Sequence, residues 1–238
     1  EKTLPMVPEI VAWAQRNPAK VQVVVFIAFR TADTDRFDYY AGRDKVEMRK
    51  IVYDGGRPER IDISSREIAG VIQERFPRYR PAAYLNGTEK PDGLKWLMAL
   101  VVNDGEEIVG SVGPKFVELV QVANHLWKGR YLGYAGPKVM ARAKALLPLA
   151  LMDGGLAGVA RRWGAKLLRR PWRAVRPLHL QSIMIIQPID ETADGRASMC
   201  DGCPDMTVHD GELVWSCRLE EQLLFGGWLR ATPRQIGR

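Results

Sequence analysis

Apolar side chains recur at helical spacing in several stretches of the chain. Residues 8–17, PEIVAWAQRN, place their apolar side chains on one side and start with a proline, which suits a first helical turn. Residues 64–76 repeat this pattern, with serines at the start that can cap a helix. A further apolar stripe begins at Pro114. We therefore predict three helices in the first half of the chain.

Other stretches are apolar without helical spacing. Residues 21–30, VQVVVFIAFR, form an almost unbroken β-branched and aromatic run, which is typical of a strand buried on both faces of a parallel sheet. Two further strands flank Asn103-Asp104-Gly105, where Asp-Gly is a strong tight-turn signal. Residues 178–190 supply another apolar strand. Helix followed by buried strand predicts an α/β layer or barrel.

Composition allows a substantial core and places the positive charge in one segment. The chain has 238 residues, of which 46% are apolar, so it can form one large domain or one domain with an appendage. Its net charge is +7, but residues 138–177 hold ten Lys or Arg against one acid, a net charge of +9. The remainder of the chain is therefore slightly acidic. We expect this basic segment to meet an acidic partner surface.

The basic segment also carries many leucines. It is interrupted by Pro148, Gly154-Gly155 and Pro171, and it has no uncharged apolar run long enough to span a membrane. Two short amphipathic helices lying on a surface fit this pattern better. Trp163 and Trp172 accompany the charges and favour contact with an anionic membrane surface. A solvated helical face is the alternative, and nucleic acid is less favoured because no recognised binding motif is present.

All three cysteines lie within residues 199–217, at Cys200, Cys203 and Cys217. An odd number argues against a pure disulfide framework, and the tight spacing favours metal ligands in a reducing compartment. The first residues lack the basic region and apolar core of a signal peptide. We therefore expect a cytoplasmic protein, peripheral to the membrane through its basic segment.

Local geometry can bring the three thiols together. Cys200 and Cys203 share one tight turn, in which Gly202 lets the backbone bend. The following residues read as a hairpin that turns at Asp210-Gly211 and returns the chain to Cys217.

Three thiolates fit more than one kind of metal site. An iron–sulfur cluster needs four iron ligands, so one iron would be bound by another group, bound from elsewhere or left open to substrate. A zinc ion would reach four ligands if His209 completed a Cys3His set. The remaining alternative is three reduced thiols without a metal.

Residues 197–221, ASMCDGCPDMTVHDGELVWSCRLEE, resemble the C-terminal segment of a group of radical SAM enzymes. In these enzymes a Cys-x-x-Cys-Pro-Asp stretch, a short hairpin and a Cys-Arg pair follow the catalytic barrel. Residues 7–15 and 23–30 are also similar to later helices and strands of a radical SAM partial barrel.

The resemblance implies an α/β fold in three consecutive regions. Residues 1–136 would form the later part of a partial (β/α) barrel with α+β elements. Residues 137–177 would form the basic amphipathic arm. Residues 178–238 would form an α+β metal-binding extension, in which Cys200, Cys203 and Cys217 hold an auxiliary [4Fe–4S] cluster.

One departure limits what the resemblance implies for catalysis. The Cys-x3-Cys-x2-Cys loop that holds the SAM-cleaving cluster would need a cysteine at position 196, which is Arg196. We therefore expect the catalytic N-terminal half to lie outside this chain, and no catalytic residue is assigned.

The parent enzyme would use S-adenosyl-L-methionine for radical chemistry on an unreactive carbon of a small-molecule or lipid-like substrate. The alternative is a non-enzymatic, zinc-stabilised binding module that contacts a membrane or nucleic acid through its basic arm.

Overall fold

The computed structural model describes residues 3–28, 32–48, 63–89, 94–131, 140, 142–187, 189–203 and 205–234. The chain folds into two compact units, each built from segments that are distant in the sequence. The first, here called the sheet unit, comprises Glu1–Phe26, Ser65–Tyr84 and Trp96–Ile186. The second, the cysteine unit, comprises Ile27–Ser64, Leu85–Lys95 and Gln187–Arg238.

These units differ from the three consecutive regions expected from the sequence. The apolar strand near residue 180 was grouped with the cysteine segment, but it pairs with strand β5 (Trp96–Asn103) and so belongs to the sheet unit. Residues after 187 instead join a segment from the first quarter of the chain.

The sheet unit contains a mixed sheet covered by helices. Its helices are η1 (Leu4–Met6), α1 (Val7–Arg16), α2 (Ser65–Arg75), α3 (Pro114–Lys128), η3 (Ala143–Leu151), α5 (Gly154–Arg169) and η4 (Pro171–Val175). Its strands are β1 (Val23–Ile27), β4 (Ala83–Leu85), β5, β6 (Ile108–Ser111) and β7 (His179–Ile186). The helices predicted near residues 8–17 and 64–76 and after Pro114 are thus confirmed.

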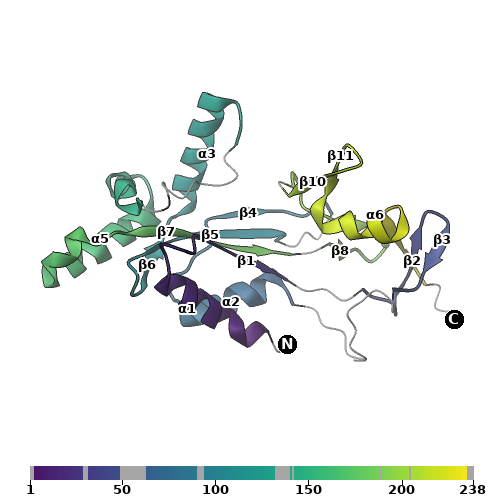
Figure 1. Cartoon of the computed structure of the whole chain (residues 1–238), viewed down its shortest axis with the longest axis horizontal. Coiled ribbons are helices and arrows are strands. Elements are labelled where there is room, and N and C mark those ends of the chain that lie inside the picture. The colour runs from purple at the N-terminus through teal and green to yellow at the C-terminus, as the bar shows by residue number, and fades with distance from the viewer. Residues whose placement is uncertain are drawn as a thin grey trace. The chain divides into compact units, whose positions relative to one another are not determined.

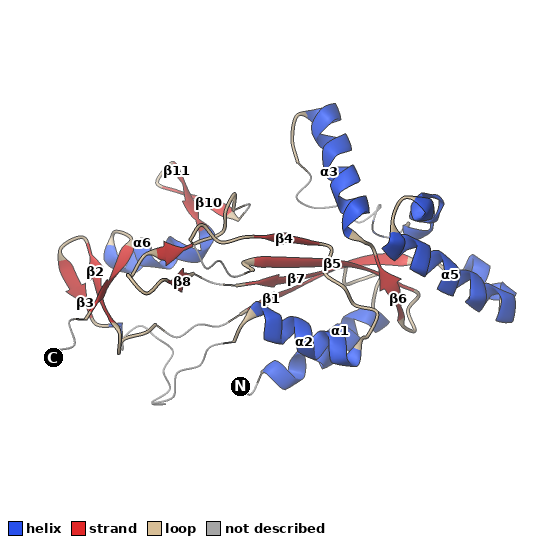
Figure 2. Cartoon of the chain, turned by 180° about the vertical axis from the view of Figure 1, so that it is seen from behind, coloured by secondary structure: helices blue, strands red, loops and turns tan. Residues whose placement is uncertain are grey.

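Strand order in this sheet is β1-β7-β5-β4, and β6 also pairs with β5. The β5–β7 pair is antiparallel, from Trp96↔Ile186 to Asn103↔His179, and so is β5–β6. Figures 1 and 2 show α1 and α2 side by side against one side of the sheet, with α3 directed away from the other. Leu156 and Val159 of α5 pack with Val109 of β6 in the main core.

Residues 21–30 do not form the doubly buried strand expected from their composition. Strand β1 lies at the end of the strand order, and Val23, Val25 and Ile27 are exposed, Ile27 by 71%. Strands β5 and β7, which have neighbours on both sides, are nearly continuously buried, and the short strand β6 is buried throughout. An apolar run alone does not distinguish an edge strand from a central one, since both favour β-branched residues.

The mixture of helices and strands is confirmed, whereas a radical SAM barrel is not shown. The described strands form several small sheets, and none of these closes into a barrel. Strands β6 and β7 both run antiparallel to β5, unlike the parallel strands of a (β/α) barrel.

The cysteine unit is built from short strands and one helix. Its elements are β2 (Phe37–Ala41), β3 (Asp44–Val46), β8 (Asp190–Glu191), β9 (Ala197–Ser198), β10 (Met206–His209), β11 (Glu212–Trp215), η5 (Ser216–Arg218), α6 (Leu219–Phe225) and β12 (Leu229–Pro233). Strand β2 pairs antiparallel with both β3 and β12, and β8 pairs with β9.

One buried carboxylate fixes the start of two helices in the sheet unit. Asp153 is the N-cap of α5, and its Oδ1 accepts hydrogen bonds from the backbone N–H groups of Leu156 (2.9 Å) and Gly113 (2.8 Å). Its Oδ2 accepts a bond from Phe116 N (3.2 Å), in the first turn of α3. Free N–H groups at a helix start need such acceptors. Asp153 therefore holds α3 and α5 together where β6 ends.

The same junction requires close backbone approach at Gly155. A Cβ atom on Gly155 would lie 2.5 Å from Gly113 N and 2.5 Å from Ser111 O. Both contacts are with backbone, which cannot rotate away as a side chain can.

We predict opposite effects for two alanine substitutions in α5. Gly155→Ala should lower the free energy of unfolding by about 1–3 kcal/mol, because the new methyl group overpacks the junction. Gly164→Ala, with no atom within 4 Å of its Cβ, should raise it by up to about 1 kcal/mol through helix propensity. Urea unfolding measures both, and a Gly155→Ala protein as stable as Gly164→Ala would contradict the close approach.

Candidate functional site

The hairpin predicted between the cysteines is present. Strands β10 and β11 pair antiparallel, from Met206↔Trp215 to His209↔Glu212, which leaves a two-residue turn. Asp210 and Gly211 in that turn have φ values of 50° and 82°. Positive φ at both positions suits the twist of a tight hairpin, and Asp and Gly are among the residues that tolerate it.

The base of the hairpin brings Cys217 back to Cys203. Ser216 N donates a hydrogen bond to Asp205 O (3.2 Å), and Cys203 Sγ lies 3.6 Å from the same oxygen. Partial burial and then the neighbouring Cys203 raise the pKa of the Cys217 thiol, against an opposing effect of Arg218. The two thiols are therefore close enough to interact electrostatically.

Cys200 is held by a different segment. Its backbone forms an antiparallel bridge with Gly87, and Asp201 N donates a hydrogen bond to Asn86 O (2.9 Å). Gly202, between Cys200 and Cys203, has a φ of 65°, as expected for a residue that bends the backbone.

Within the described part of the chain, which includes all three cysteines and His209, no three His, Cys, Asp or Glu side chains are arranged to hold one metal ion. Cys203 and Cys217 flank the base of one hairpin, and the three cysteines do not form one metal-binding group in the described part of the chain.

His209 is poorly placed for the Cys3His zinc set considered from the sequence. It lies beside the turn of the hairpin, whereas Cys203 and Cys217 lie beyond the opposite ends of the strands. A four-residue strand separates the two ends by roughly 10 Å. The nearest acidic partner of His209 is Asp210, with 3.5 Å between Nε2 and Oδ2.

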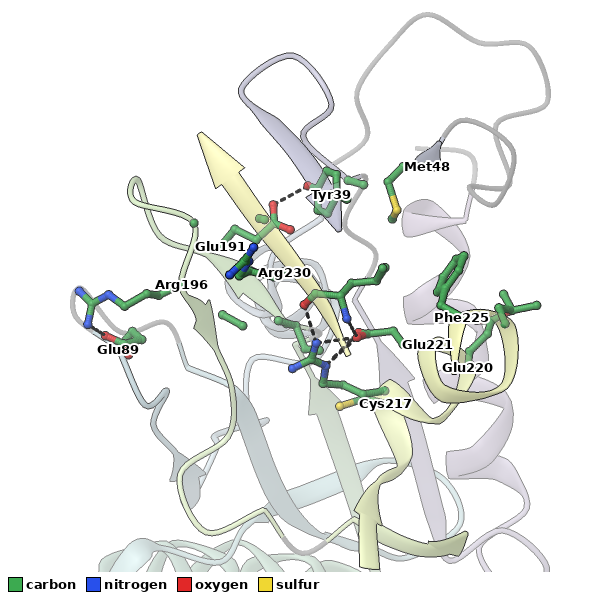
Figure 3. A pocket seen from close by; sticks show the side chains of 18 of the residues that line it. Tyr39, Met48, Glu89, Glu191, Arg196, Cys217, Glu220, Glu221, Phe225 and Arg230 are labelled. Atoms are coloured by element: carbon green, nitrogen blue, oxygen red, sulfur yellow. Dashed lines mark hydrogen bonds and ion pairs between the residues drawn. The ribbon is translucent and has the colours of Figure 1, made fainter. Parts of the chain in front are cut away.

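Cys217 lines a cavity of about 720 Å³ in the cysteine unit. Figure 3 shows side chains that line it, among them polar ones from β2, β8, the segment before β9, α6 and β12, together with Glu89. Apolar side chains, including Leu224 and Phe225, form part of the wall. Polar side chains lining the cavity include Tyr39, Glu191, Arg196, Arg218, Glu221 and Arg230.

Arg218 and Glu221 form the most extensively bonded pair in this wall. Arg218 Nε lies 2.9 Å from Glu221 Oε1 and Nη2 lies 2.5 Å from Oε2. Arg218 also donates to Leu229 O (2.8 Å), while Glu221 accepts from Leu229 N (2.7 Å). The guanidinium lies 5.0 Å from the ring centroid of Trp228. This pair therefore fixes α6 to the start of β12 next to Cys217.

Tyr39 orients a carboxylate on another part of the wall. Its hydroxyl donates to Glu191 Oε2 (2.7 Å) and accepts from Asp33 N (3.0 Å). Burial and then the hydrogen bond to Glu191 raise the pKa of Tyr39, so the hydroxyl stays protonated and remains a donor. The cavity thus combines fixed carboxylates, arginines and an apolar surface.

Sequence reasoning missed most of this wall. Only Arg218 had a local signal, because it follows Cys217 directly. Tyr39 and Glu191 lie 152 positions apart, so only the fold brings them together. Asp33, whose backbone N–H donates to Tyr39, is buried and accepts a hydrogen bond from Arg36 N (3.2 Å).

Comparison with known proteins adds no family. The chain matches no protein-family model, no curated protein and no solved structure. The radical SAM resemblance of residues 197–221 stays a prediction, and function is inferred from side-chain chemistry and geometry.

The basic segment is a second candidate site, and part of its charge is neutralised internally. Residues 104–107, the acidic loop between β5 and β6, meet three of its cations. Lys166 Nζ bonds to Asp104 and lies 2.7 Å from Glu107 Oε1. Arg173 binds Asp104 and Glu106, and Arg176 Nη1 lies 2.8 Å from Glu106 Oε1.

Asp104 is the most buried carboxylate of this loop. Burial would raise its pKa, but hydrogen bonds from Lys166 and from two backbone N–H groups outweigh burial and lower the pKa. Asp104 therefore stays charged and pairs with the arm over the whole neutral range.

The two tryptophans of the basic segment differ in exposure. The prediction that Trp163 contacts a membrane surface is wrong, because this side chain is only 4% exposed and packs in the core. Trp172 is 62% exposed.

Lys138 lies outside the described residues. Among the described helices none is long and apolar enough to cross a membrane by itself, and the η3–α5 pair, which meets both criteria jointly, bends by 114°.

We predict that Glu221, but not its neighbour Glu220, is needed for stability of the cysteine unit. Glu221→Ala would leave the buried Arg218 without its carboxylate and should cost about 3–5 kcal/mol. Glu220→Ala removes an exposed carboxylate of the same helix and should change stability by less than about 0.5 kcal/mol. Urea unfolding followed by fluorescence, to which Trp215 and Trp228 contribute from this unit, measures both. Equal losses would contradict the role given to Glu221.

Proposed function

We propose that this chain is the C-terminal part of a radical SAM enzyme and that Cys200, Cys203 and Cys217 bind an auxiliary iron–sulfur cluster. The observation that carries this proposal is the hairpin, whose base returns Cys217 to Cys203 at the wall of a cavity. The spacing of the thiols and the resemblance of residues 197–221 give the same assignment.

Metal binding at Cys217 works against the raised pKa of its thiol. Metal binding requires deprotonated thiols and releases their protons. The positive charge of Arg218 lowers the pKa of Cys217 and so opposes the effects of burial and of Cys203. Gly202 gives the turn the freedom to bring Cys200 toward the other thiols. When bound, the cluster would supply electron transfer or an iron open to substrate.

The cavity supports a small-molecule or lipid-like substrate. Its volume of about 720 Å³ lies within the ordinary range of small-molecule sites, about 300–1,000 Å³. Leu224 and Phe225 can pack against an apolar portion, while Glu191, Arg196 and Arg230 can orient polar groups. In the parent enzyme, SAM would bind to the catalytic part rather than here.

Metal analysis of anaerobically purified protein tests the cluster. We expect iron and acid-labile sulfide with a brown chromophore. Each of Cys200→Ala, Cys203→Ala and Cys217→Ala should lower the iron content. The loss in iron affinity should exceed the roughly 10–100-fold that removal of an outer-shell partner costs. His209→Ala is the matched control and should keep its iron, because His209 lies at the far end of the hairpin.

Two results would overturn this assignment. Stoichiometric zinc without sulfide, lost in His209→Ala, would support the zinc-stabilised binding module instead. Absence of any bound metal after anaerobic reconstitution would leave three reduced thiols.

The coding sequence upstream of Glu1 tests the enzymatic part separately. We expect it to extend through a Cys-x3-Cys-x2-Cys loop that holds the SAM-cleaving cluster. A start codon directly before Glu1 would exclude radical SAM catalysis by this chain, whatever metal the three cysteines bind.

A further inference from the structure

Helix α5 has an inner and an outer face of different character. Leu156, Val159 and Trp163 point into the core of the sheet unit. The outer face is exposed at Ala157, Arg161, Ala165 and Leu168, which recur at helical spacing. This outer stripe contains small and aliphatic side chains and one arginine, and it carries no acid.

Large apolar side chains become strongly exposed at the end of α5 and in η4. Leu168 is 89% exposed and Val175 is 87% exposed, unusual values for large aliphatic side chains. Arg169 and Arg170 between them are also exposed, and Trp172 projects from η4. We call this set the arm surface, and it comprises Arg161, Leu168, Arg169, Arg170, Trp172 and Val175.

The acidic loop determines which cations of the basic segment are available to a partner. Lys166, Arg173 and Arg176 bind carboxylates of residues 104–107, so their charge is largely neutralised within the sheet unit. No acid occurs between residues 154 and 177. In the described part of the chain, no carboxylate forms an ion pair with Arg161, Arg169 or Arg170. The arm surface is therefore positively charged as well as apolar.

We propose that the arm surface binds the surface of an anionic phospholipid bilayer. Arginines there would meet lipid phosphates, Trp172 would lie at the headgroup level, and Leu168 and Val175 would enter the acyl boundary. Phosphates of a nucleic acid would match the arginines equally well but offer nothing to exposed aliphatic side chains.

This inference does not rest on the proposed cluster. The arm surface belongs to the sheet unit, whereas the cysteines belong to the cysteine unit. Vesicle binding by metal-free and iron-loaded protein separates the two proposals, since either can fail while the other holds.

Vesicle sedimentation of the full chain tests the electrostatic part. At low salt we expect binding to phosphatidylcholine vesicles containing phosphatidylglycerol, and little binding to pure phosphatidylcholine. Each arginine near an anionic surface contributes about fivefold, so the double variant Arg169→Gln/Arg170→Gln should bind about 25-fold more weakly. The matched control Arg16→Gln/Lys20→Gln removes two exposed cations around the end of α1 and should bind like wild type.

A tryptophan pair tests the apolar part. Trp172→Ser should weaken vesicle binding by about tenfold, because it removes an interfacial anchor. Trp13→Ser is the control, since Trp13 is similarly exposed (54%) but lies on α1. All substituted side chains are exposed, and unchanged urea midpoints would verify that each variant folds.

Three outcomes would overturn the proposal. Equal binding to neutral vesicles would remove the electrostatic part, and equal losses in the control variants would remove the assignment to the arm surface. Salt-sensitive binding to a DNA or RNA duplex without binding to vesicles would identify nucleic acid as the partner.

Discussion

The sheet unit depends on the buried carboxylate of Asp153. Three backbone N–H groups from two helix starts converge on its two oxygens, and Gly155 lets the backbones approach closely enough for this to happen. The direction in which α5 leaves the sheet is therefore set by one side chain. That direction decides which face of α5 enters the core and which carries its arginines into solvent.

The acidic loop shows why net charge is a poor guide to an interface. A tight connection between β5 and β6 places carboxylates against the inner cations of the basic segment. Formal charge counts these cations together with those of the outer face, although in the described part of the chain Arg161, Arg169 and Arg170 form no ion pair with a carboxylate. Hydrogen bonds from Lys166 and from two backbone N–H groups keep Asp104 ionised, although burial alone would raise its pKa.

Features decided by local geometry could be predicted from the sequence. The turn at Asp210-Gly211 needs positive φ at both positions, and helix periodicity identified α1 and α2. Features decided by tertiary context could not be predicted. Residues 21–30 resemble a central strand in composition, but their exposure depends on which strands flank β1. Trp163 and Trp172 are likewise the same residue type in the same basic segment, but the fold buries Trp163 and leaves Trp172 exposed.

Strand β2 finds its partner β12 only near the end of the described chain, and this order has a consequence for biosynthesis. Closing so long a loop costs entropy and must await synthesis of β12. Cys217 precedes β12 by a single short helix, so the thiols and the strand that completes their cavity emerge from the ribosome almost together. Until β12 pairs with β2, Cys217 lacks the wall that β12 gives its cavity, and its thiol is more open to oxidation.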